Sequence, residues 1–218
     1  MSIFRLTSSN IAASRLHNQH LAGPRFERVE DVVQWLGAVQ AQEYAGATWG
    51  IAQRARDLTS ALLAQAFAEG KILRTHLLRP TWHFVVPADI YWMLELTAPR
   101  VHALNAYYYR QFELDDELFA KSYSVLTKAL QGGKQLTRQE LAKILADSGI
   151  TASGLRLAYI FMHAELDVLI CSGALRGKQQ TYALLSERVA QAKTCSHEAA
   201  LAELARRYFT SHGPATLK

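Results

Sequence analysis

Cysteine and long apolar runs are both scarce in this sequence. Its only cysteines are Cys171 and Cys195, and one possible pair is too few to staple a secreted domain, so we expect two reduced thiols. The most apolar stretch, residues 72–96, is broken by charged residues and histidines and falls short of the ~20 apolar residues that a membrane span needs. The first five residues, MSIFR, lack the pattern of a signal peptide. We therefore expect a cytoplasmic protein with no membrane partner.

The composition of the chain is otherwise that of a folded, somewhat basic protein. Hydrophobic residues make up 50% of the 218 residues and charged residues 20%, which allows a sizeable core and argues against global disorder. The formal net charge of +5 favours an anionic partner, because surface Lys and Arg attract polyanions.

Helical periodicity dominates the first half of the chain. Apolar residues recur at spacings of three and four, and they predict helices over residues 11–21, 29–40 and 58–67. Residues 46–54 are expected to form a further turn or a short helix. Thr59 or Ser60 is a candidate cap for the last of these, and Gly70 a candidate stop. The β-favouring runs 72–78 and 81–86, separated by Arg79-Pro80, then predict a hairpin. Three helices followed by a two-stranded wing is the layout of a winged-helix domain.

The same layout follows the acidic stretch 113–117, which we take as an internal boundary. Thr137 and Glu140 form a capping box that opens a helix, and helices are also expected over residues 118–130, 154–169 and 198–210. Residues 169–171 and 181–184 are predicted strands, joined by a loop that carries Arg176 and Lys178.

The fold class predicted from these patterns is mainly α with small β-hairpins (α+β), arranged as tandem winged-helix domains. We divide the chain into a first unit, 1–112, a second unit, 113–196, and residues 197–218. This last part holds a helix and, from Gly213-Pro214 onward, what we interpret as the truncated start of a third unit.

Winged helices suggest where DNA would bind. The helix over 154–169 offers Arg156, and the wing offers Arg176 and Lys178. That helix is apolar nearly all round, so we favour a buried helix and expect the wing to make the DNA contacts.

The most informative segment is VQAQEY, in which Gln40 and Gln42 flank a small apolar residue at a predicted helix end. A Gln-x-Gln pair alone is a weak motif. Its neighbours strengthen it, because an aromatic-rich stretch and the hairpin THLLRPTWHFVV follow.

At this point the sequence resembles the AlkZ-type winged-helix DNA glycosylase family. The resemblance rests on LGAVQAQEYAGATWGIAQR, the hairpin, LICSGALRGKQQTYALL and ARRYFTSHGPAT, and it spans essentially the whole chain. It implies three tandem winged helices, a concave basic face, and excision of purines alkylated at N7, including unhooking of interstrand crosslinks. It also implies that Gln40 and Gln42 lie at the catalytic centre.

Weak functional groups are sufficient for such a reaction. An N7-alkylated purine is already cationic, so it can leave without a general acid, and the enzyme must supply a positioned water and stabilise the positive sugar. We expect a monomer that binds alkylated double-stranded DNA, with Arg74, His76, Arg79 and His83 as phosphate contacts. The resemblance implies that a third unit completes the DNA cleft, and we expect only the start of that unit in this sequence. The chain could therefore be an active enzyme or a catalytically incomplete piece of one.

No metal or cofactor is expected. His76 and His83 lack further ligands at suitable spacing, and no Gly-rich phosphate loop is present. Two other functions stay open: a non-catalytic winged-helix DNA-binding protein such as a transcription regulator, and a protein-interaction module. A regulator would use an exposed, polar recognition helix, and an interaction module would show no salt-dependent affinity for DNA.

Overall fold

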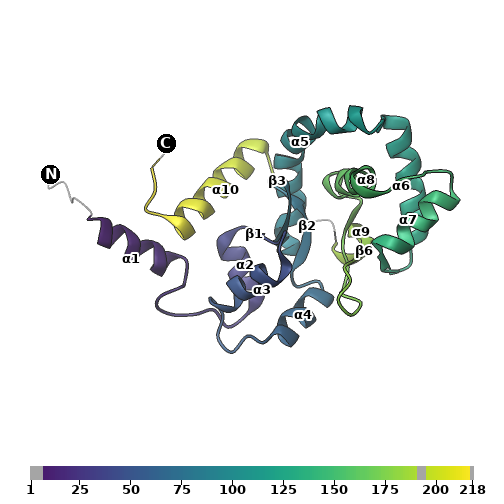
Figure 1. Ribbon diagram of the computed structural model, residues 1–218. Helices are drawn as coiled ribbons and strands as arrows, with labels where there is room; N and C mark the ends of the chain where they lie inside the picture. The colour runs from purple at the N-terminus through teal and green to yellow at the C-terminus, as the bar shows by residue number, and fades with distance from the viewer. Residues whose placement is uncertain (1–6, 191–194, 217–218) are drawn as a thin grey trace.

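The computed structural model describes residues 7–190 and 195–216 (Figure 1). Its helices are α1 (Ser8–Asn18), α2 (Val29–Leu36), α3 (Tyr44–Ala52), α4 (Ser60–Ala68), α5 (Pro87–Gln111), α6 (Asp116–Leu130), α7 (Arg138–Asp147), α8 (Gly154–Leu166), α9 (Leu185–Arg188) and α10 (His197–His212). Its strands are β1 (Val39–Gln40), β2 (Leu73–Leu77), β3 (Arg79–Val85), β4 (Leu136–Thr137), β5 (Ile170–Ser172) and β6 (Thr181–Leu184). The predicted absence of a signal peptide concerns residues 1–5, and the predicted second unit includes 191–194; both stretches lie outside the described residues.

One order of elements occurs twice along the chain. Helix, strand, two helices and two strands follow each other as α2-β1-α3-α4-β2-β3 and again as α6-β4-α7-α8-β5-β6. Each set contributes a three-stranded antiparallel sheet, with orders β1-β3-β2 and β4-β6-β5. The two halves lie side by side in Figure 1, and α10 returns to the first half. The expected class, helices with small antiparallel sheets, is confirmed.

The first strand of each sheet is missing from the sequence-based prediction. The helix expected over 29–40 ends at Leu36, because Gly37 takes a φ of 80°, a left-handed conformation that ends a helix and that glycine adopts without strain. Val39 and Gln40 then pair with Phe84 and His83 of β3. The glutamine segment is therefore a strand, and its prediction as a helix end is wrong.

The turn of the first hairpin also differs from its prediction. It lies at Leu78, with a φ of 63°, rather than at Arg79-Pro80. A register shift between His76 and Leu77 makes room for this tight turn. Pro80 lies near the start of β3, a position at which a missing N–H is tolerated.

Capping residues locate several helix starts correctly. Thr59 caps α4 through the amide of Leu62, and the capping box of Thr137 and Glu140 opens α7 as predicted. The helix expected over 11–21 is shifted to Ser8–Asn18, because Thr7 and Asn10 form a second capping box upstream.

The two halves share part of their core. Leu73 and Leu77 of β2 belong to the same apolar cluster as Met162 and Leu166 of α8, and β2 packs against both α8 and β5. At this junction buried Glu165 bonds His76 Nδ1 and accepts from Trp82 Nε1 at 3.3 Å. The division into units at residue 112 remains a prediction. Within residues 7–190 and 195–216, none of the helices is long and apolar enough to cross a membrane.

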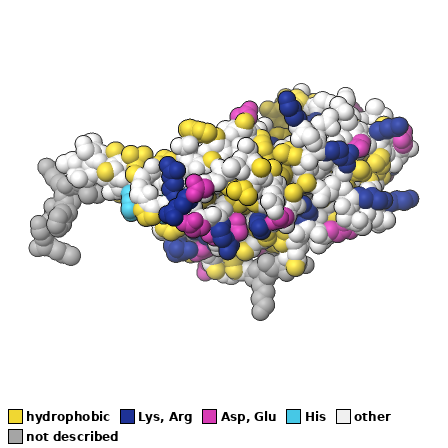
Figure 2. Space-filling model, turned by 90° about the horizontal axis from the view of Figure 1, so that it is seen from below, with side chains coloured by type: hydrophobic (Ala, Val, Ile, Leu, Met, Phe, Trp, Pro, Cys, Tyr) yellow, Lys and Arg dark blue, Asp and Glu magenta, His cyan; other side chains and the backbone are white. Residues whose placement is uncertain are grey.

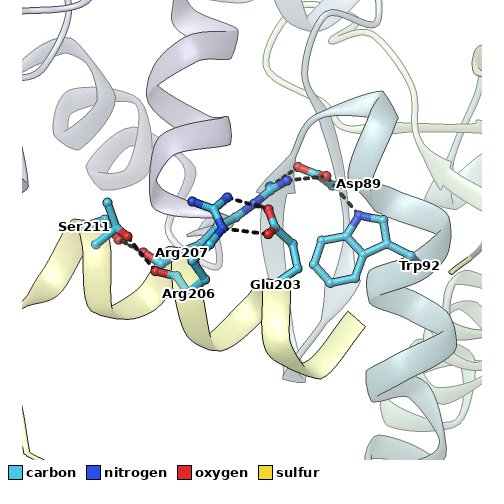
Figure 3. Close-up of polar contacts among 7 residues, drawn as sticks. Asp89, Trp92, Glu203, Arg206, Arg207 and Ser211 are labelled. Atoms are coloured by element: carbon cyan, nitrogen blue, oxygen red, sulfur yellow. Dashed lines mark hydrogen bonds and ion pairs between the residues drawn. The ribbon is translucent and has the colours of Figure 1, made fainter. Parts of the chain in front are cut away.

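An ion-pair network fixes α10 against the first half. Arg207 of α10 pairs with Asp89 of α5, and Asp89 also accepts from Trp92 Nε1 at 2.9 Å (Figure 3). Glu203 holds Arg207 from the preceding turn at 2.7 Å. Arg207 and Asp89 are largely buried, so these bonds are shielded from water.

Replacing Asp89 by alanine is expected to loosen α10. The buried Arg207 guanidinium loses its main partner, and a hydrogen bond to a charged group contributes about 2 kcal/mol. Hydrogen exchange of the α10 amides measures the effect, with Glu198→Ala at the exposed start of the same helix as control. If the α10 amides were equally protected from hydrogen exchange in Asp89→Ala and Glu198→Ala, this role for Asp89 would be contradicted.

Candidate active site

Gln40 and Gln42 lie on the same side of the chain at β1. Successive side chains of an extended segment alternate between its two faces, so the residues flanking Ala41 share one face. Ala41 is fully buried in the core of the first half, whereas both glutamines are exposed. The small residue between them faces the core and the two amides face outward.

Strand β3 orients both glutamine side chains. Arg79 Nη2 donates to Gln40 Oε1 at 3.1 Å, and the backbone N–H of Trp82 donates to Gln42 Oε1 at 3.4 Å. Guanidinium and backbone N–H groups can only donate, so each amide turns its oxygen toward β3. Each oxygen keeps a second lone pair.

The glutamines line a cavity of about 560 Å³ built from several parts of the chain. Strand β1 supplies Gln40, and Gln42 follows it. Helix α3 contributes Gly46 and Gly50, where an added Cβ would meet no atom closer than 3.6 Å, so this wall is left open. His212, the last residue of α10, completes the lining together with Arg54, whose pKa is lowered by burial.

His83 lies beside Gln40 on the same face of the sheet. The two residues are Cα partners across the β1–β3 pair, and His83 is 3% exposed. Its Nδ1–H donates to the Thr81 carbonyl at 2.9 Å. Burial lowers the pKa of His83 to about 4, so the ring is neutral at physiological pH. A neutral, buried ring cannot serve as the predicted phosphate contact.

Acid is expected to destabilise the protein through His83. Its folded pKa, about 4, lies below its ordinary 6.5, so the unfolded chain binds the extra proton between these values. The contribution of neutral His83 to the free energy of unfolding is fully present above pH 6.5. Up to about 3 kcal/mol of it is lost as the pH falls toward 4. Denaturant unfolding measures how much the free energy of unfolding changes between pH 7 and pH 4.5. This change should be smaller for His83→Gln than for the wild type or for the control His17→Gln, at an exposed site. An unchanged difference would contradict this assignment.

Burial also argues against two other predicted DNA contacts, Arg74 and His76. Arg74 lies on the opposite face of the sheet, donates from Nε to the Ala41 carbonyl at 3.1 Å, and stacks 4.4 Å from the Trp82 ring. His76 is 3% exposed and bonds Glu165. Neither side chain reaches the surface that the glutamines share with His212.

The remaining predicted contacts are accessible to different degrees. Arg79 is exposed beside Gln40, and Lys178 is exposed in the second hairpin loop. Arg176 is exposed but pairs with Glu140 at 2.7 Å. Arg156 is half-buried and donates to the carbonyls of Phe112 and Thr151, so its bonds hold the protein together. The expected burial of α8 is confirmed, since its residues 160–162 and 164–166 are buried.

Charge on the surface is mixed rather than segregated on the side that Figure 2 shows. Among the described residues on this face, Lys and Arg side chains are interspersed with Asp and Glu and separated by apolar groups. The described residues on this side therefore form no continuous basic surface, and the concave basic face that the resemblance implies stays a prediction.

Sequence reasoning missed two groups of residues. Arg54 and His212 join the glutamines only in three dimensions, although His212 lies in the YFTSHGPAT segment that already stood out as a motif. His102, His163 and Asp167 also converge, with ligand atoms within 4.8 Å of one another, which is a spacing that a metal ion accepts.

The His102 cluster is satisfied without a metal. His102 Nε2 bonds Asp167 at 2.9 Å, Tyr123 donates to Asp167 at 2.7 Å, and His163 Nδ1 bonds the Tyr123 oxygen at 2.5 Å. These bonds lower the pKa of Asp167, which stabilises its ionised form. We assign the cluster a structural role in joining α5, α6 and α8.

A comparison with protein-family models identifies the family of this chain. A family model described as DNA glycosylase AlkZ-like matches residues 33–218, while no curated protein sequence matches. The chain is also similar to the solved structure of Streptomyces sahachiroi DNA glycosylase AlkZ, with a TM-score of 0.75 and 23% identity, over 93% of this chain and 56% of that protein. The likeness shows a shared fold, and the chain spans little more than half the length of the Streptomyces protein. On the family match, the chain belongs to the AlkZ-like DNA glycosylase family.

Proposed function

We propose that this chain hydrolyses the N-glycosidic bond of purines alkylated at N7 in double-stranded DNA, with Gln40 and Gln42 at the reacting centre. The observation that carries the proposal is the position of the two amides. They lie on one exposed face, are oriented by β3, and line a cavity with room for a reacting group.

The chemistry of the cavity suits a cationic leaving group. The C1′–N9 bond of an N7-alkylated purine breaks as its electron pair neutralises the base, and positive charge develops on the sugar. Two amide oxygens held by β3 place partial negative charge where that sugar would lie, without reorganising during the reaction. A neutral purine is released far more slowly in such a site, because it carries no positive charge for the electron pair of the broken bond to neutralise.

We propose that DNA is held by two winged-helix units, one formed by α2 to β3 and one by α6 to β6. The repeated order of elements and the three-stranded sheets support this division. Exposed Arg79 would contact phosphates near the lesion, and Lys178 would do so from the second wing. Unhooking of crosslinks follows the same chemistry where the crosslink is attached at N7.

Base release tests the proposal. The chain is incubated with a duplex carrying one N7-methylguanine and with a matched duplex carrying 8-oxoguanine, and the Streptomyces protein serves as the comparison enzyme. We expect release of N7-methylguanine and retention of the neutral base.

Duplex binding that weakens with salt, without release of any base, would instead support a non-catalytic DNA-binding protein. The buried α8 already argues against a regulator that reads bases with that helix, since its core-facing residues cannot reach a groove.

A further inference from the structure

His212 meets the glutamines although 170 or more positions separate them in sequence. Its ring lines the same cavity, and the chain around it is fixed on several sides. Asn18 Nδ2 donates to the Gly213 carbonyl at 2.9 Å, and Arg15 Nη2 donates to the Pro214 carbonyl at 2.9 Å. A Cβ at Gly213 would lie 2.4 Å from the Phe209 carbonyl oxygen, so only glycine fits directly after His212.

The hydrogen bonds of Ser211 determine which ring nitrogen of His212 carries the proton. Buried Ser211 has one hydroxyl hydrogen, and it donates this to the Arg207 carbonyl at 2.7 Å (Figure 3). The Ser211 oxygen can then only accept from His212 Nδ1, which lies 2.8 Å away. Nδ1 therefore carries the hydrogen, and Nε2 is left with a lone pair. Among the described residues, no hydrogen bond engages Nε2.

Three other acceptors in the cavity each accept one hydrogen bond from the protein. The oxygens of Gln40 and Gln42 each accept one hydrogen bond from β3. Glu43 accepts from the amide of Ala45 as the N-cap of α3. An amide is also too weak a base to take a proton from water. The amide oxygens can therefore orient the attacking water, but its proton needs a stronger base, and the lone pair on Nε2 of His212 provides one.

We propose that His212 is a third catalytic residue, whose Nε2 binds the attacking water and takes its proton. This inference rests on the proposed glycosylase function. The water oxygen bonds C1′ as the C1′–N9 bond breaks, and the electron pair of that bond neutralises the alkylated purine. One water proton passes to Nε2, which leaves a hydroxyl on C1′, and His212 later releases the proton to solvent.

Charge around the ring favours its neutral form. Burial lowers the pKa of His212, the backbone of Tyr208 raises it, and the charge of Arg54 lowers it. The segments around α10 present the following titratable groups: Arg15 and His17 from α1, Asp31 from α2, Glu43 and Arg54 from the residues that flank α3, and Asp89 from α5, paired with Arg207. The base form should therefore dominate at neutral pH, with activity lost as the pH falls through a pKa that lies below the ordinary 6.5.

Single-turnover release of N7-methylguanine between pH 5 and 9 tests the proposal. The variants are His212→Ala, His212→Gln and, as a matched control on the same helix, exposed His197→Ala. We expect both His212 variants to release base about 100-fold more slowly, with the acid limb of the pH profile abolished and duplex affinity unchanged. Melting curves identify a variant that fails to fold, in which case the other His212 variant decides.

Three results would overturn the inference. If the wild type and the folded His212 variants were equally active, His212 would have no catalytic role and the proposed function would stand. If the wild type released no base, both the role of His212 and the proposed function would be contradicted. Imidazole ¹⁵N chemical shifts that place the hydrogen on Nε2 would contradict the assigned tautomer without any activity measurement.

Discussion

Replacing Gln42 by alanine is expected to slow the release of N7-methylguanine by about 10²–10³-fold, the effect of removing one preorganised polar group from a charge-developing site. The Gln42 amide is held by the backbone of β3 rather than by a mobile side chain, so little structural change should accompany the loss. Single-turnover rates at saturating protein measure this effect, because they separate the chemical step from DNA binding.

Gln34→Ala is the matched control, since Gln34 is an exposed glutamine on the neighbouring helix α2. Wild-type rates are expected for it, and both variants should bind duplex with unchanged affinity. If Gln42→Ala released base as fast as Gln34→Ala, the glutamine face of β1 would not be the reacting centre.

The largest effect on stability is expected from Glu165→Ala. Glu165 is fully buried at the junction of the two halves, where it accepts from Trp82 and bonds His76. Alanine would leave buried His76 and half-buried Trp82 without this partner and create a cavity, at a cost of about 3–5 kcal/mol. Denaturant unfolding monitored by tryptophan fluorescence measures the loss.

Glu95→Ala provides the comparison, because Glu95 is exposed in the middle of α5 and its removal should change the free energy of unfolding by less than about 0.5 kcal/mol. Glu165→Gln keeps the size of the side chain and should fall between the two. A Glu165→Ala protein as stable as Glu95→Ala would show that the junction contributes little to the fold.

The sequence predicted the elements that depend on local chemistry. Thr137 and Glu140 specify the start of α7 by themselves, and the β-favouring runs around Trp82 specify a hairpin. Strand β1 was not predicted because Val39 continues the apolar spacing of α2, and only the conformation of Gly37 ends that helix. Pairing with β3, which is distant in sequence, then makes the segment a strand.

The candidate site was predictable only in part. Gln40 and Gln42 stand out as a motif, and their exposure on one face agrees with what that motif requires. The burial of Arg74, His76 and His83 was not visible, since a cationic or polar residue in a hairpin is usually exposed and only tertiary packing covers it. His212 reaches the cavity through the Arg207–Asp89 pair, a contact that no local pattern encodes.

The most direct test of the glutamine centre is a crystal structure of the chain bound to a duplex that carries a cationic 1-azaribose sugar in place of one nucleotide. This analogue resembles the positive sugar of the transition state. We predict that its ring nitrogen lies about 3 Å from a side-chain oxygen of Gln40 or Gln42, inside the cavity closed by His212. A duplex bound across another face, with the analogue away from β1, would contradict the account.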